Sequence, residues 1–191
     1  MSGGSGEQAI LSCGVAQMGQ YIGLPTGTAA GMSDAKLPDI QAGYEKGITT
    51  VMAGLAGANM VYESAGMHAS LLGFCLESLV IDNDMLGQAM RCVRGIEVDT
   101  SRLSLETMRE VALVGPGHYL GTEQTMSLMQ TEYVYPKIGD RLSPKEWAEV
   151  GKPEIVEQAK RKVAEIRAKK PTHIDPALDQ MIREKFNIYV T

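Results

Sequence analysis

The feature that most constrains the fold is a repeated pattern in which a short apolar run ends in polar residues and is followed by helical spacing. The first run, TGTAAG, begins at Thr26 and leads into the loop MSDAKLPD, which contains Ser33, Asp34 and Lys36. Apolar residues at helical spacing then continue from residue 39 to about residue 56. A chain that alternates strands and helices in this way is typical of a parallel sheet.

The same pattern occurs twice more along the chain. A strand is expected at Asn59–Tyr62, ending in Glu63, and another at Ser78–Ile81, ending in Asp82. Parallel strands bring their carboxyl ends to one edge, where barrel and doubly wound enzymes carry their chemistry. We therefore expect Asp34, Glu63 and Asp82 to lie on one face.

Helices are expected on both sides of these strands. The first covers about Glu7–Tyr21 after a Ser5 cap, and Asp39 is expected to cap the second. After Gly95 the alternation stops, and helical segments follow in SLETMREVALV, around Thr122–Thr131, in SPKEWAEVG, in PEIVEQAKRKVAEIRAKKP and in DPALDQMIREKF. The pattern divides the chain into βα units at 1–95 and remaining elements with a helical tail at 96–191.

Three βα units are too few to close a TIM barrel, which needs eight strands and usually about 250 residues. Two architectures therefore remain open: an open α/β layer with a helical tail, or the C-terminal part of a longer barrel enzyme. Three unclosed strands leave free edges that invite pairing with another chain. We expect the polypeptide to form a homo-oligomer, to be poorly soluble, or to lack a natural N-terminal part.

Composition excludes several classes of partner. The hydrophobic content of 44% and charged content of 21% are ordinary for a globular protein. A net charge of −5 without a basic stripe argues against nucleic acid. No apolar run reaches the roughly 18 residues that span a bilayer, and no secretory leader is recognisable, so we expect no membrane partner and a cytoplasmic location. Cys13, Cys75 and Cys92 are interpreted as free thiols without metal spacing.

Several blocks of the sequence together resemble one known family. They are SGGSGEQAIL, GLPTGTAAGMSDAKLPDIQAGYEK, LAGANMVYESAGMHASLLGFCLESLVIDNDMLG, RGIEVD, GHYLGTEQT and EYVYPKIGDR. In order and spacing they are similar to the C-terminal portion of the trimethylamine methyltransferase family. The resemblance implies an α/β fold, namely the C-terminal part of a TIM (β/α)8 barrel with a helical tail. It also implies methyl transfer from a methylated amine to a corrinoid that a separate protein carries, with no cofactor bound tightly by this chain.

The family that the chain resembles has two branches. In one branch the catalytic residue is pyrrolysine, and the Gly-x-Ser-Asp pattern places that position at or next to Met32. A chain with methionine there resembles the branch without pyrrolysine, whose members act on quaternary amines such as glycine betaine. The alternative is that pyrrolysine lies upstream of Met1. Trimethylamine and a quaternary amine therefore both remain open as the substrate.

The candidate catalytic residues are Met32, Asp34 and Glu63. Met32 offers no acid, base or strong nucleophile, so filling a flexible pocket is its simplest role. A quaternary ammonium has no lone pair to protonate, so its methyl transfer mainly needs alignment and desolvation. Asp34 and Glu63 are expected to hold the cation, with a loop clasp and a structural ion pair as their alternative roles. Asp39 and Asp82 are interpreted as helix caps.

The candidate substrate-binding residues are Lys36, Tyr62, His68, His118 and Tyr119. Lys36 is expected to offset carboxylate repulsion or to bind an acidic end of the substrate. His118 and Tyr119 lie in GPGHYLG, a glycine-rich loop that allows close backbone approach to a cofactor. The alternatives are a hydrogen-bonding role for His68 and a structural turn for GPGHYLG. No metal ligands are expected.

Two other functions remain open. Another TIM barrel lyase would need a lysine at a strand end, whereas Lys36 and Lys46 are expected on a loop and in a helix. A non-catalytic fragment or interaction module of a methyltransferase is the second alternative. Gel filtration and an activity assay distinguish it from an enzyme.

Overall fold

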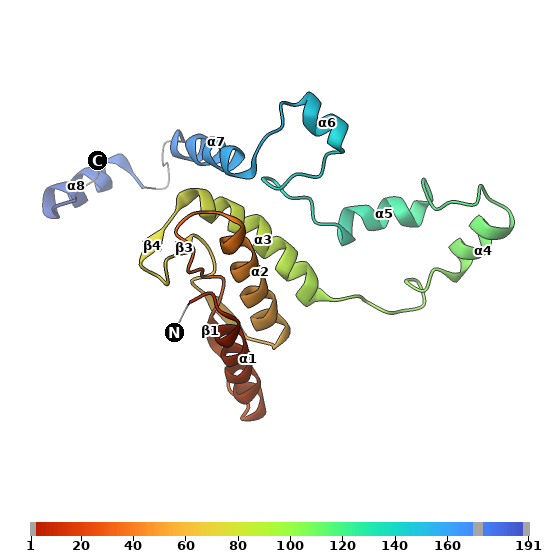
Figure 1. Ribbon diagram of the computed structural model, residues 1–191, viewed down its shortest axis with the longest axis horizontal. Helices are drawn as coiled ribbons and strands as arrows, with labels where there is room; N and C mark the ends of the chain where they lie inside the picture. The colour runs from red at the N-terminus through yellow and green to blue at the C-terminus, as the bar shows by residue number, and fades with distance from the viewer. Residues whose placement is uncertain (1–2, 170–173, 189–191) are drawn as a thin grey trace.

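The computed structural model describes residues 3–169 and 174–188, which form an N-terminal body followed by a helical arm (Figure 1). The body contains three long helices and four short strands. In chain order its elements are α1 (Gly6–Tyr21), β1 (Gly27–Ala29), α2 (Ile40–Leu55), β2 (Met60–Tyr62), β3 (Met67–His68), β4 (Gly73–Phe74) and α3 (Leu76–Arg94).

The strands β1 and β2 form the parallel pair that the sequence predicts. Gly27 pairs with Met60 and Ala29 with Tyr62, and α2 provides the crossover between the two strands. The Ala30 amide extends the pairing by donating to the Tyr62 carbonyl at 3.3 Å. The carboxyl ends of both strands therefore lie at the same edge.

The predicted third parallel strand is wrong. Residues 78–81 belong to α3, whose buried residues Ser78, Asp82 and Ala89 recur on one helical face. The apolar run LVI is too short to distinguish a strand from a helix, and the surrounding residues 76–94 favour the helix. Asp82 consequently lies inside a helix and neither ends a strand nor caps a helix. The preceding segment forms an antiparallel hairpin, in which Met67 pairs with Phe74.

The helices pack through their small residues. On α1 the buried positions are Ala9, Ser12, Ala16 and Gly19. A Cβ at Gly19 would lie 1.6 Å from the Thr26 hydroxyl oxygen, so the close approach of α1 to the start of β1 requires glycine. The larger residues of α1 that predicted the helix by their spacing are all more than half exposed; they are Ile10, Leu11, Val15 and Met18.

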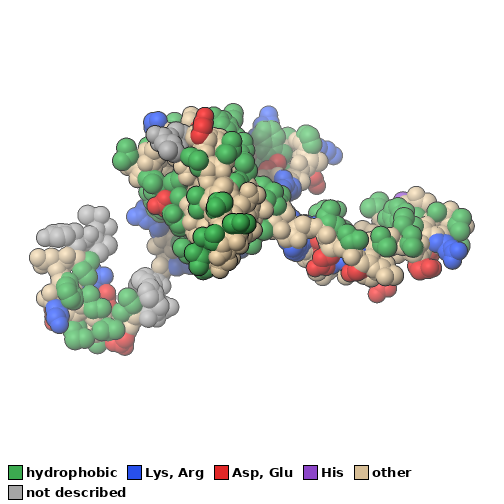
Figure 2. Space-filling view, turned by 90° about the horizontal axis from the view of Figure 1, so that it is seen from below, with side chains coloured by type: hydrophobic (Ala, Val, Ile, Leu, Met, Phe, Trp, Pro, Cys, Tyr) green, Lys and Arg blue, Asp and Glu red, His purple; other side chains and the backbone are tan. Residues whose placement is uncertain are grey.

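On α2, too, the large apolar residues are exposed while small and polar residues are buried. Its Asp39 cap is confirmed, because the carboxylate accepts the Ala42 amide at 3.1 Å. Its apolar stripe nevertheless faces outward, and Ile40 is 87% exposed. The residues that α2 buries are small or polar; they are Ala42, Glu45, Lys46, Thr49, Thr50 and Ala53. Hydrophobic side chains therefore cover much of the visible face of the body (Figure 2).

The arm follows α3, and its described residues form five helices. They are α4 (Leu105–Leu113), α5 (Glu123–Glu132), α6 (Pro144–Glu149), α7 (Ile155–Arg167) and α8 (Pro176–Lys185). The helices α4 and α5 extend away from the body, and α7 returns to pack against α3 (Figure 1). All five were expected from the sequence, and α6 begins with the capping box of Ser143 and Glu146. None of the helices in the described part of the chain is long and apolar enough to cross a membrane.

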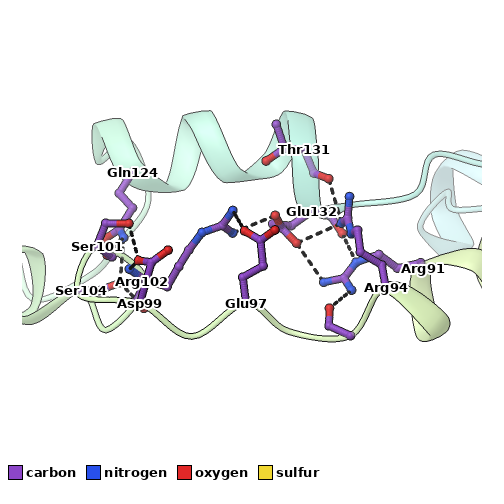
Figure 3. A network of polar contacts seen from close by, with 11 residues as sticks. Arg91, Arg94, Glu97, Asp99, Ser101, Arg102, Ser104, Gln124, Thr131 and Glu132 are labelled. Carbon is purple, nitrogen blue, oxygen red and sulfur yellow. Dashed lines mark hydrogen bonds and ion pairs between the residues drawn. The ribbon is translucent and has the colours of Figure 1, made fainter. Parts of the chain in front are cut away.

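One carboxylate attaches the arm to the end of α3. Glu132, the last residue of α5, contacts Arg91 and Arg94 of α3 at 3.0 Å each and Arg102 at 2.8 Å (Figure 3). Arg91 also donates to the Glu132 carbonyl at 2.8 Å. A second carboxylate, Asp84 of α3, accepts the consecutive backbone amides of residues 137–139 at 2.6–3.1 Å. These two carboxylates thus attach the arm to α3 in addition to the packing of α7.

Candidate functional site

The candidate site begins with the turn that follows β1, residues 32–36, called here the β1 turn. Met32 is only 3% exposed and Ser33 is fully buried, whereas Asp34 is half-buried and Lys36 is exposed. The Lys36 ammonium donates to the Asp34 carbonyl at 2.7 Å, so these two residues form a local clasp. The turn thus holds a methionine inside the body and a carboxylate at its surface.

The β1 turn lies beside the end of β2. Gly31 has a φ of +80°, and a Cβ at this position would lie 2.7 Å from the Ser64 carbonyl oxygen. The close approach therefore requires glycine and brings the two strand ends together. Tyr62 and Glu63 are both exposed at this edge, and Glu63 has a left-handed φ of 62°. The segments that contain Asp34 and Glu63 thus both follow the paired ends of β1 and β2, whereas Asp82, which was expected with them, lies in α3.

A second segment holds the β1 turn from the side. The Ser70 amide donates to the Ser33 carbonyl at 3.2 Å, and the Ala69 amide donates to the Ala35 carbonyl at 3.1 Å. The Ser70 hydroxyl also contacts the Asp34 carboxylate, which accepts the Gly3 amide at 3.1 Å. Asp34 is therefore fixed from two directions.

This second segment has an unusual backbone. Ala69, Ser70 and Leu71 are three consecutive residues with φ between 50° and 73°. Residues other than glycine seldom adopt the left-handed region, and such strain persists where surrounding contacts impose it. Here the imposed geometry directs the Ser70 side chain toward Asp34.

A buried polar cluster of His68, Ser78, Lys46 and Asp82 contacts the β1 turn through His68. The His68 Nδ1 lies 3.1 Å from the Ala35 carbonyl oxygen, which can only accept, so this nitrogen carries the proton. Its Nε2 lies 2.5 Å from the Ser78 hydroxyl oxygen and 3.5 Å from the Lys46 ammonium. Lys46 in turn pairs with Asp82 at 2.6 Å. His68 is buried and connects the β1 turn to α3, which is the hydrogen-bonding role left open for it.

The sequence does not identify Glu45, which holds the β1 turn from α2. Its carboxylate accepts the Ser33 hydroxyl at 2.6 Å, the Asp34 amide at 2.9 Å and the Gln41 side-chain amide at 2.9 Å. In the sequence, Glu45 and Lys46 form an ordinary charged pair between two glycines, Gly43 and Gly47. Their position opposite the apolar stripe of α2 resembles a solvated face, which explains why they are missed.

The remaining candidates lie elsewhere. His118 and Tyr119 are exposed in the connection between α4 and α5, on the part of the arm that extends away from β1 and β2 (Figure 1). The structure therefore does not bring them to the edge that carries Asp34. Two further aromatic residues, Tyr133 and Tyr135, follow the end of α5 and stack on each other with ring centroids 6.4 Å apart. Within residues 3–169 and 174–188, no group of three His, Cys, Asp or Glu side chains is placed to hold a metal ion.

The parallel β1–α2–β2 unit, in a body that is otherwise mostly helical, is consistent with an α/β fold. Comparison with known proteins identifies the family. The family Trimethylamine methyltransferase (MTTB) matches residues 1–191, and the chain belongs to this family.

Curated relatives agree with this assignment. Trimethylamine methyltransferase MttB of Methanosarcina thermophila is 38% identical over 163 residues, which cover 85% of this chain and 33% of that protein. Glycine betaine methyltransferase of Desulfitobacterium hafniense (strain Y51) is 28% identical over 191 residues, which cover 100% of this chain and 38% of that protein. The chain thus spans about a third of the length of the curated relatives it matches.

Proposed function

We propose that the chain forms part of the active site of a TIM barrel methyltransferase that moves a methyl group from a methylated amine to a corrinoid held by a separate protein. The observation that supports this most directly is the β1 turn, which follows the carboxyl end of β1 and holds Asp34 through Glu45 and Ser70 in a member of the trimethylamine methyltransferase family. In a barrel, the carboxyl ends of the strands are the place where catalytic residues lie.

The residues of this turn suit a quaternary amine as the methyl donor. Met32 occupies the position proposed to hold pyrrolysine in other relatives, and its thioether cannot form an adduct with an amine. A quaternary ammonium already carries the charge that makes the amine a leaving group, so the protein mainly has to align and desolvate it. Asp34 and Glu63 supply the negative charge that a desolvated cation needs.

The corrinoid, when present, supplies a nucleophilic cobalt that accepts the methyl group. The side chains of Lys36, Tyr62 and Glu63 are exposed, and we propose that they face the group carried on the other protein. Tyr62 offers an aromatic face to a methylated ammonium by cation–π attraction. Lys36 is proposed to bind an acidic end of the substrate, such as the carboxylate of a betaine.

The test is a methyl-transfer assay on the whole protein that carries this sequence. The donor is either glycine betaine or trimethylamine, and the acceptor is a corrinoid protein reduced to Co(I). We expect turnover of glycine betaine and a large loss of that turnover when Asp34→Ala and Glu63→Ala are combined. The matched control combines Glu106→Ala and Glu123→Ala, which remove two exposed carboxylates from the arm and should leave turnover unchanged.

Two results would overturn the proposal. Robust turnover of trimethylamine with methionine at position 32 would contradict a quaternary substrate. Unchanged betaine turnover in the Asp34→Ala and Glu63→Ala double variant would show that these carboxylates do not hold the cation. A protein that transfers no methyl group from either donor would instead support a non-catalytic role.

A further inference from the structure

Glu45 is a buried carboxylate whose contacts concentrate on the β1 turn. Only 8% of the residue is exposed, and a buried carboxylate must be hydrogen-bonded or paired to be tolerated. In the described part of the chain, no lysine, arginine or histidine lies within 4.0 Å of its carboxylate oxygens. Its partners are the hydroxyl of Ser33, the amide of Asp34 and the side chain of Gln41. Among the described residues, it is therefore hydrogen bonds that stabilise this carboxylate.

The two bonds to the β1 turn fix consecutive residues. One oxygen, Oε2, accepts both the Ser33 hydroxyl at 2.6 Å and the Asp34 amide at 2.9 Å. The Ser33 hydroxyl oxygen also accepts the Ala35 amide at 2.9 Å, so the restraint continues to the next residue. Charge-assisted bonds of this length are roughly twice as strong as neutral ones. The backbone on both sides of the Asp34 side chain is thus held by Glu45.

The strained segment 69–71 completes the restraint from the opposite side. Its Ser70 amide holds the Ser33 carbonyl, and its hydroxyl contacts the Asp34 carboxylate. Glu45 and Ser70 therefore hold the same two turn residues from α2 and from the β3–β4 hairpin. Groups that act on a substrate must be held to within a fraction of an ångström, which such second contacts provide.

We infer that Glu45 is a positioning residue that fixes the orientation of the Asp34 carboxylate toward a methylated ammonium. The inference rests on the proposed function for the identity of the ligand. Glu45 itself is enclosed by its hydrogen-bond partners, so it acts through Ser33 and Asp34 and does not touch the substrate. Loss of its negative charge leaves the turn in place but weakens the bonds that orient Asp34.

The experiment compares Glu45→Gln and Ser33→Ala in the whole protein that carries this sequence. The matched control is Asp84→Asn, which alters another carboxylate that accepts backbone amides but lies on α3, away from the β1 turn. We measure KM and kcat for glycine betaine with a Co(I) corrinoid protein, the melting temperature, and amide hydrogen exchange of residues 33–35. Each variant is also made in an Asp34→Ala background.

We expect Glu45→Gln to raise the KM for betaine about tenfold, with a smaller change in kcat, because binding of the cation is what it disturbs. Ser33→Ala should act in the same direction. The effect of Glu45→Gln on KM should disappear in the Asp34→Ala background, since residues that act as one unit are not additive. Asp84→Asn should leave KM unchanged, whatever it does to the melting temperature.

The inference is overturned if Glu45→Gln lowers the melting temperature without changing KM, or if its effect on KM persists after Asp34→Ala. Failure of the proposed function has a different signature, because the unaltered protein would then transfer no methyl group at all. In that case amide exchange still tests whether Glu45 restrains the β1 turn. Faster exchange at residues 33–35 in Glu45→Gln, but not in Asp84→Asn, supports this restraint. Unchanged exchange refutes it.

Discussion

The Lys46 ammonium of α2 lies 2.6 Å from the Asp82 carboxylate of α3, and both side chains are almost completely buried. Asp82 Oδ2 also accepts the Gly66 amide at 2.7 Å. The ion pair therefore connects three parts of the body, namely the crossover helix, the start of the β3–β4 hairpin and α3. The Lys46 ammonium also lies 3.5 Å from Nε2 of His68, and the other ring nitrogen of His68 contacts the β1 turn.

Removing one partner of this ion pair should strongly destabilise the protein. Asp82→Asn or Lys46→Met alone leaves an uncompensated buried charge, which costs about 3–5 kcal/mol of unfolding free energy. The double variant Lys46→Met, Asp82→Leu removes both charges and should recover much of this loss. Urea denaturation followed by circular dichroism measures these differences. A single variant with wild-type stability would contradict the pairing. The control is Lys160→Met, which removes one partner of the exposed ion pair between Lys160 and Glu157.

Acidification should loosen the attachment of the arm. A hydrogen bond from Arg102, together with the positive charges of Arg94 and Arg91, holds the pKa of the Glu132 carboxyl below its ordinary value of 4.5. A carboxyl with a lowered pKa in the folded state contributes stability that is complete above its unfolded pKa and is lost as the pH falls through the folded pKa. The protection of α5 amides against hydrogen exchange, taken relative to the intrinsic exchange rate at each pH, should therefore fall below about pH 4.5.

The control for this pH dependence is Glu132→Gln, which cannot titrate. In this variant the amides of α5 should be less protected at pH 7 than in the unaltered protein. Lowering the pH should then change their protection little. If both proteins respond equally to acid, another group is responsible. The network in Figure 3 would then not explain how α5 is attached.

Local sequence was sufficient to predict the elements whose ends are marked by capping or polar residues. The caps Ser5, Asp39 and Ser143 are followed by helices, and the polar residues after Ala29 and Tyr62 mark the ends of real strands. The short run at residues 78–81 is also followed by polar residues, beginning with Asp82, so this mark does not distinguish it from a strand, and its helical continuation decides its conformation.

The interior of the candidate site could not be predicted in the same way. Glu45 and Lys46 are buried only because α2 presents its small and polar face to the β1 turn and to α3. Apart from Gln41, their side-chain contacts reach residues that lie 11 to 36 positions away in the sequence, such as Asp34 for Glu45 and Asp82 for Lys46. Asp34 and Glu63 were predicted to share an edge because parallel pairing of two strands is sufficient to place them there.

Relief of backbone strain should stabilise the β3–β4 turn. Ala69 has a φ of 50°, where an alanine costs roughly 1–2 kcal/mol and a glycine almost nothing. After subtraction of the extra unfolded-state entropy of glycine, roughly 0.5–1 kcal/mol, Ala69→Gly should raise the unfolding free energy by up to about 1.5 kcal/mol. The same change at Ala42, in the helical part of α2, should lower it. Destabilisation by Ala69→Gly would show that the left-handed turn is not strained.

Residues 1–191 expressed alone should self-associate. The outward faces of α1 and α2 carry large apolar side chains that are more than half exposed, including Leu11, Val15, Ile48 and Leu55. Contiguous apolar patches of this kind promote association. Light scattering coupled to gel filtration should therefore give a mass above the 20.6 kDa of one chain.

Charges placed on that surface should reverse the association. Combined Val15→Lys and Ile48→Lys interrupts both apolar faces without touching a buried residue, so the fold should persist and the measured mass should fall toward that of a monomer. Val114→Lys is the matched control, because Val114 is also exposed but lies on the arm after α4. A monomeric unaltered chain, or equal effects of the double variant and the control, would show that the outward faces of α1 and α2 do not drive association.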